Sequence, residues 1–208
     1  MIIELELAPG DVLREDELRS QLGFGRTPIR EAIQRLARDQ FVTVVPRRGV
    51  FVTGLDVSEL SMLYETRAVL EPYAARLAAT RGSDVHWREM EEALRSGQAE
   101  STGKQLLRVD RRCHEIMWDA ASNRFLVDTL DMLYAQSDRL WHMYLANDID
   151  MSHPLQQHQE ILDALQAGHA DAAAELVELH VREFDQKVRN AVADRLQPVL
   201  PVSGIMAQ

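Results

Sequence analysis

The stretch of residues 14–53 constrains the fold more than any other part of the chain. Its centre combines a periodic apolar face with a basic face, which together predict an amphipathic helix. The apolar positions are Ile29, Ile33 and Leu36. The polar face carries Arg26, Thr27, Arg30, Gln34, Arg35 and Arg38. Taken alone, such a helix is explained equally well as a solvated charged surface.

The flanking sequence decides between these explanations. A short helix predicted at 15–22 precedes the basic helix, and Gly23 supplies the turn between the two. The β-branched runs 42–45 and 50–53 follow, joined by Pro46-Arg47-Arg48-Gly49, which predicts a hairpin with two arginines at its tip. A helix fits the major groove of DNA, where its arginines can bond base edges and phosphates. We therefore predict a winged helix-turn-helix.

At these residues the sequence resembles the DNA-binding domain of GntR-family bacterial regulators. The match covers residues 22–32 and the wing at 46–49. Together with the basic face, it predicts that seven residues contact DNA: Arg26, Thr27, Arg30, Arg35, Arg47, Arg48 and Gly49. Gly25 stands where a serine is common, and Gln40 where a glycine usually ends the helix. The family's first helix has almost no counterpart here, so we expect a domain at 1–54 with that helix truncated.

Charge is divided unevenly along the chain. The net charge is −10, yet residues 1–55 hold eight arginines and eight acidic residues and contribute none of it. The acidic remainder should therefore be repelled by DNA. With one cysteine, no signal peptide and no apolar run long enough for a membrane, the protein is expected to be cytoplasmic and to have no membrane partner.

Every segment after the wing is predicted to be helical, with glycines among the breakers. The predicted helices are 56–81, 84–99, 103–121, 123–147, 153–167 and 169–195. We therefore expect a mainly α protein, in which the winged domain is followed by an all-α bundle of about six helices at 55–196. The residues at 197–208 should form a flexible tail. Six helices after a GntR-type domain resemble the FCD effector domain.

Four ionisable residues interrupt the apolar faces of these helices: Asp110, His114, His158 and His180. Asp110 and His114 are four residues apart and so share one helix face. Buried singly, each histidine is more simply a core residue bonded to a neighbour. Buried together, they are costly unless they satisfy one another, and a divalent metal ion such as Zn, Ni, Mn or Fe would do so. The set also resembles the FCD metal-binding residues.

Arg67 and Glu71 fall within the apolar face of the first effector helix. They could form an internal ion pair, whereas FCD domains resembling this chain use an arginine there to hold an organic acid. We therefore predict that Arg67 binds an effector. Asn123 resembles the family's turn and is predicted either to contact the effector or to cap a helix. Because the helix carrying Arg67 follows the wing closely, it is the expected route by which effector binding reaches the winged domain.

The leading interpretation is a transcription regulator, not an enzyme. It would bind a palindromic DNA operator as a homodimer and respond to a small carboxylate effector held at a divalent metal ion. Two alternatives remain open at this point. One is a metal-sensing repressor without an organic effector, and the other is a metalloenzyme with a DNA-binding appendage. The second is disfavoured because no HExxH pair occurs and no acid lies beside the site as a base.

Overall fold

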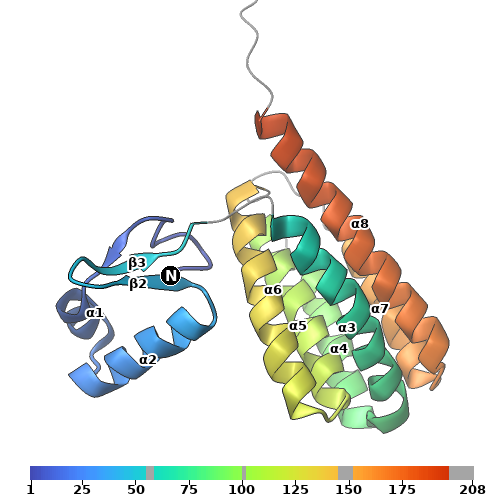
Figure 1. The fold of residues 1–208 in the computed structure, drawn as a ribbon. Coiled ribbons are helices and arrows are strands. Elements are labelled where there is room, and N and C mark those ends of the chain that lie inside the picture. The colour runs from blue at the N-terminus through green and yellow to red at the C-terminus, as the bar shows by residue number, and fades with distance from the viewer. Residues whose placement is uncertain (55–58, 100–101, 145–151, 197–208) are drawn as a thin grey trace, which may run out of the picture.

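The computed structural model describes residues 1–54, 59–99, 102–144 and 152–196. A small winged domain lies beside a bundle of helices, which confirms the predicted fold (Figure 1). The expected tail at 197–208 lies outside the described residues. Within the described ranges, no helix has the length and hydropathy needed to cross a membrane.

Two helices of the winged domain form where the apolar spacing predicts them. α1 (Glu15–Leu22) ends at Gly23, whose φ of 71° lies in the left-handed region that glycine adopts without strain. α2 (Arg26–Arg38) begins after Gly25 and buries Ile29 and Ile33 against the small sheet. The burial of only one face leaves the basic face of α2 free.

Three short antiparallel strands complete the winged domain. β2 (Val42–Val45) and β3 (Gly49–Val52) form the predicted hairpin, while β1 (Val12–Leu13) adds a third strand on the other side of β3. β1 was not predicted, because two residues cannot show an alternating pattern. The described residues 1–11 contain no helix, and Ile2 packs into the core of this domain.

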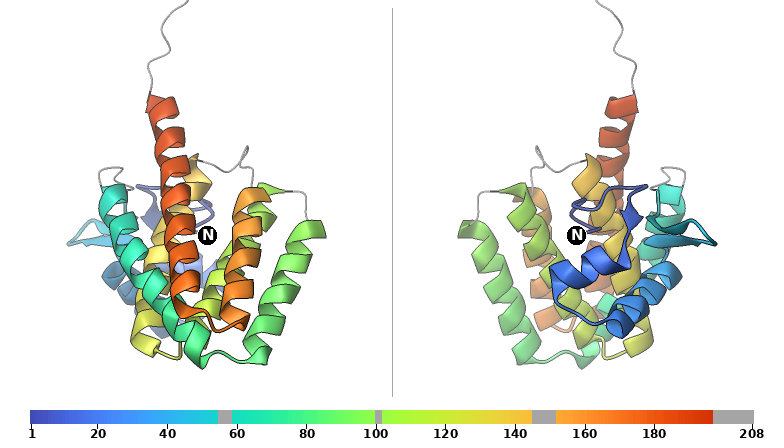
Figure 2. Two further views of the ribbon diagram at one scale, coloured as in Figure 1. Left: turned by 90° about the vertical axis from the view of Figure 1, so that its right-hand side faces the viewer. Right: turned by 90° about the vertical axis from the view of Figure 1, so that its left-hand side faces the viewer.

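The remaining described residues form a bundle, seen from two sides in Figure 2. Its helices are α3 (Leu60–Arg81), α4 (Asp84–Ala99), α5 (Gly103–Ala120), α6 (Arg124–Tyr144), α7 (Ser152–Gln166) and α8 (Ala170–Leu196). Most ends agree with prediction to within one or two residues. The predicted residues 56–58 and 145–147 lie outside the described ranges.

α6 lies on the side of the bundle that faces the winged domain (Figure 1). Its Ala135 belongs to the apolar core of the winged domain. The amide of Gln136 donates to the carbonyl of Asp39 over 2.8 Å, and the guanidinium of Arg139 donates to the carbonyl of Thr53. α6 is therefore shared by both halves of the molecule.

Candidate metal centre and DNA-binding surface

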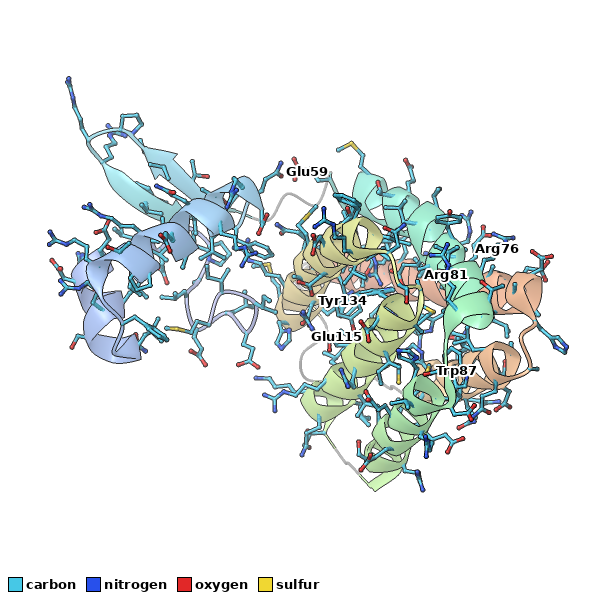
Figure 3. The ribbon with its side chains drawn as sticks, turned by 90° about the horizontal axis from the view of Figure 1, so that it is seen from below. Glu59, Arg76, Arg81, Trp87, Glu115 and Tyr134 are labelled. Carbon is cyan, nitrogen blue, oxygen red and sulfur yellow. The ribbon has the colours of Figure 1, made fainter. Side chains whose placement is uncertain are left out.

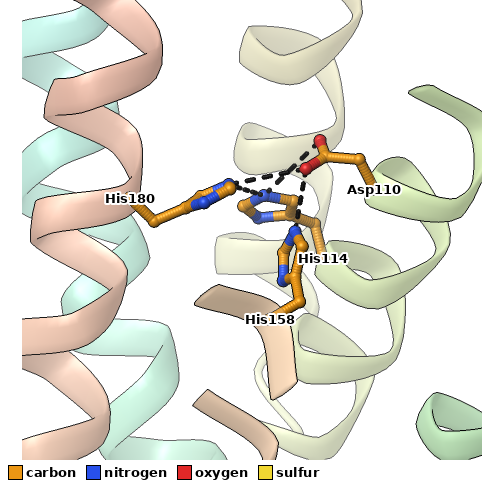
Figure 4. A group of neighbouring side chains, drawn as sticks. All are labelled: Asp110, His114, His158 and His180. Atoms are coloured by element: carbon orange, nitrogen blue, oxygen red, sulfur yellow. Dashed lines mark hydrogen bonds and ion pairs between the residues drawn. The ribbon is translucent and has the colours of Figure 1, made fainter. Parts of the chain in front are cut away.

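Asp110, His114, His158 and His180 meet inside the bundle, as the sequence predicted (Figure 4). They come from α5, α7 and α8, are all buried, and offer ligand atoms that lie within 4.8 Å of one another. His158 Nε2 is 2.8 Å and His180 Nε2 is 3.5 Å from Asp110 Oδ1. The packing of the helices thus brings three imidazoles together around one carboxylate.

The outer nitrogens of two of these histidines face acceptors. His114 Nδ1 lies 2.7 Å from Glu71 Oε2, an ion-pair distance although the two are not aligned as a regular hydrogen bond. His180 Nδ1 lies 3.0 Å from Gln157 Oε1, and the amide nitrogen of Gln157 donates to Glu183. Because each Nδ1 faces an acceptor, we assign the ring proton of the neutral imidazole to Nδ1 in both histidines. Outer partners of this kind orient metal-binding histidines.

The inner nitrogens are therefore left as lone pairs that face each other. His114 Nε2 and His180 Nε2 are only 3.2 Å apart. Two acceptors at that distance repel unless a cation lies between them. Two nitrogens that each lie about 2.0–2.1 Å from a tetrahedral zinc would be about 3.3–3.4 Å apart. The donor types and their spacing fit a divalent metal ion.

The environment also sets the protonation states that a metal site requires. Burial opposes ionisation of Asp110, yet the close contacts of its carboxylate with the rings of His158 and His180 hold the pKa of this carboxyl well below its usual range. Burial is the largest cause that lowers the pKa of His158, to about 4. A carboxylate and a neutral imidazole are the forms that bind metal.

Arg67 is buried next to this group and is linked to it through Glu71. Its Nε lies 2.6 Å from Glu71 Oε1, so the two residues form the internal ion pair that the sequence left open as the alternative to effector binding. Burial opposes the ionisation of Glu71, but the charges of Arg67 and His114 lower its pKa to about 2. Arg67 Nη1 has no hydrogen-bond partner in the described part of the chain. That N–H group remains able to bond an acidic ligand.

Asn123 is not brought into this group. Its side-chain oxygen accepts from the backbone N–H of Leu126 at the start of α6, which is a capping contact. Tyr134 is the α6 residue that reaches the cluster, and it lies eleven residues, or about 16 Å of helix, from Asn123. The structure therefore supports the capping alternative for Asn123.

Sequence analysis missed two polar partners of the cluster. Tyr134 OH donates to Asp110 Oδ2 over 2.6 Å, and Gln157 holds His180. Tyr134 stands in an apolar run where tyrosine resembles ordinary core packing. Gln157 precedes His158, yet it serves a histidine on α8, which sequence spacing cannot reveal. Glu71, the partner of His114, could have been found from the sequence, because it falls within an apolar face.

The seven predicted DNA contacts are all exposed on the winged domain. Those of α2 lie in its first three turns, and Arg47 and Arg48 form the turn between β2 and β3. Arg30 Nε is paired with Glu15 Oε2 at 2.9 Å, while Arg26 lies 4.0 Å from Asp16. Both pairs are largely exposed, so they hold the arginines only weakly. DNA phosphates can therefore replace these acids.

Comparisons with known protein families match both halves of the chain. Residues 1–52 match the family described as bacterial regulatory proteins, gntR family, and residues 62–183 match the FCD domain. The Nta operon transcriptional regulator of Aminobacter aminovorans is 31% identical over 205 residues, which cover 93% of this chain and 94% of that protein. The HTH-type transcriptional repressor RspR of Escherichia coli is 27% identical, with coverage of 90% and 84%.

Solved structures show the same fold. Escherichia coli McbR/YncC superposes with a TM-score of 0.80 at 21% identity, covering 93% of this chain and 92% of that one. A putative GntR regulator from Rhodococcus sp. RHA1 gives a TM-score of 0.71 at 23% identity, with coverage of 91% and 92%. The family matches and these relatives agree with the winged domain and bundle described above. The chain belongs to the GntR family of bacterial regulatory proteins, carries an FCD domain, and is a DNA-binding transcription regulator.

Proposed function

We propose that the regulator binds a divalent metal ion through Asp110, His114, His158 and His180, and that a small organic acid at this ion changes its affinity for DNA. FCD domains commonly bind metal. The observation that carries the proposal is the 3.2 Å approach of two histidine nitrogens whose outer nitrogens both face acceptors. In this proposal the metal centre binds an effector and does not catalyse a reaction.

Charge favours an acidic effector. A divalent ion and Arg67 bring three positive charges, and the carboxylates of Asp110 and Glu71 bring two negative ones. The buried site therefore has one uncompensated positive charge, which an anion would neutralise. Arg67 Nη1 and any open position on the metal are the groups that would hold a carboxylate.

A homodimer on a palindromic operator completes the proposal. One recognition helix covers only one half-site, so paired half-sites require two copies related by a two-fold axis. The acidic bundle is the better place for their interface, because the winged domain uses its surface for DNA. Light scattering at micromolar concentration tests this, and a monomer both with and without zinc would contradict it.

Elemental analysis of purified protein tests the metal site. We expect stoichiometric metal in the wild type and its loss in a His158→Ala/His180→Ala double variant. His86→Ala/His153→Ala is the matched control, because these two histidines lie outside the cluster and should not change the metal content. Equal, substoichiometric metal in all three proteins would overturn the assignment.

A metal-sensing repressor without organic effector is the second candidate, and the pairing of Arg67 with Glu71 favours it. If Arg67 serves only to hold Glu71 against His114, no acid needs to bind. Thermal shift with a panel of organic acids, with and without chelator, separates the two. Stabilisation by an acid that requires both metal and Arg67 supports the effector, and its absence across the panel supports the metal sensor.

A further inference from the structure

α6 carries no residue of the metal cluster, yet it contacts both that cluster and the winged domain. On α6, Tyr134 donates to Asp110 Oδ2, while Gln136 and Arg139 bond backbone carbonyls of the winged domain. Tyr134 and Gln136 are two residues apart and therefore point about 200° away from each other around the helix. Figure 3 labels Tyr134 on α6, between the winged domain and the rest of the bundle.

The connection to the cluster is short and specific. Asp110 presents Oδ1 to His158 and His180, which leaves Oδ2 for Tyr134. The next residue on α5, Arg111, pairs with Asp131 of α6 at 2.7 Å. Any ion that fixes the carboxylate of Asp110 therefore also fixes the position of α6 relative to α5.

The connection to the winged domain includes a buried cation. Arg139 is fully buried, yet no carboxylate lies within ion-pair distance of it among the described residues, and its Nε has no partner there. Burial of a cation with no carboxylate beside it in the described ranges is costly, so part of the energy of docking is lost at this residue. Separation of the two halves would return Arg139 to water, which makes the docked arrangement easy to bias.

We propose that α6 is the coupling element of this regulator, with Tyr134 holding Asp110 on one side and Gln136 with Arg139 holding the winged domain on the other. The proposal rests on the metal site proposed above. It differs from the route expected from sequence through the helix after the wing. The hydrogen bonds described between the two halves come from α5 and α6, and none of them comes from α3.

Hydrogen–deuterium exchange of the full chain, stripped with chelator or loaded with Zn²⁺, tests the coupling without any operator or effector. Peptides from α5, α7 and α8 report whether zinc binds. Peptides covering residues 36–53 report whether α6 holds the winged domain more firmly. In the wild type we expect zinc to slow exchange in both sets, by about fivefold or more in the winged domain.

Tyr134→Phe is the decisive variant, and Ser137→Ala is its control. Both remove one buried hydroxyl from α6, but within the described residues Ser137 bonds only the carbonyl of Leu133 in its own helix. Tyr134→Phe should keep the zinc response of the bundle and lose that of residues 36–53, as should Gln136→Ala/Arg139→Gln. Ser137→Ala should keep both responses.

The remaining outcomes separate the two proposals. A bundle that responds to zinc while residues 36–53 of the wild type do not would overturn the coupling and leave the metal site standing. A Tyr134→Phe protein with an undiminished response in the winged domain would do the same. If neither peptide set of the wild type responds, the metal assignment fails, and the coupling fails with it.

Discussion

The two halves of this regulator use charged residues in opposite ways. In the winged domain the arginines predicted to contact DNA are exposed, and two of them face loosely held acids, as Arg30 faces Glu15. In the bundle Arg67 and Glu71 are almost completely buried and bonded to each other at 2.6 Å. Exposed charges can exchange partners at little cost, which suits a surface that must bind DNA. Buried charges have no such freedom, so their arrangement defines one specific site.

The largest effect should follow from breaking the buried pair. Glu71→Leu leaves Arg67 buried without a counter-charge, and we expect the free energy of unfolding to fall by roughly 3–5 kcal/mol. The double variant Arg67→Met/Glu71→Leu removes both charges and should recover most of that loss. Chemical denaturation in the presence of chelator measures these values without a contribution from metal.

The exposed pair of Arg182 and Glu178 on α8 provides the matched control. It has a similar distance of 2.7 Å and the same spacing of four residues, but it is solvated. Glu178→Leu should therefore change stability by less than about 1 kcal/mol. If the exposed and buried substitutions had equal effects, the contrast between the two halves would not hold.

In the winged domain, removal of a charged side chain should weaken DNA binding and leave the free energy of unfolding almost unchanged. Arg30 is exposed on α2, so Arg30→Ala should leave unfolding almost unchanged while weakening operator binding by on the order of 1–3 kcal/mol. A DNA fragment selected by the wild-type protein from a random library serves as the probe in gel-shift titrations. If this variant bound the fragment with wild-type affinity, the assignment of Arg30 as a residue that contacts bases would be wrong.

The same contrast explains which features the sequence could predict. Helix ends and the buried faces of α2 and α5 depend on local spacing, so they were predicted to within a few residues. The inward positions of the four residues of the candidate metal centre were predicted because each interrupts an apolar face. Their partners Gln157 and Tyr134 were missed, because the atoms that meet belong to different helices. Such pairings depend on how helices pack, which periodicity does not describe.

Arg48 should show a smaller and less specific effect than Arg30. It lies in the exposed turn of the wing, next to Arg47, where a phosphate contact is expected in place of base contacts. Arg48→Ala should therefore weaken binding to all DNA sequences by a similar factor and reduce the salt dependence by about one ion. Titrations of selected and random duplexes at several salt concentrations measure this, and a loss confined to the selected duplex would contradict it.

The smallest effect concerns Gln40, which lies directly after the end of α2. Gln40 has a φ of 63°, a left-handed conformation in which a residue with a Cβ is strained, and the N–H of Phe41 there bonds the carbonyl of Leu36. Gln40→Gly should relieve that strain and raise the free energy of unfolding by about 1 kcal/mol. Gln34→Gly, at an exposed position inside the same helix, should instead lower it by about 1 kcal/mol. Opposite signs for one glutamine-to-glycine change inside α2 and one directly after it would show that backbone conformation, and not the lost side chain, determines stability at Gln40.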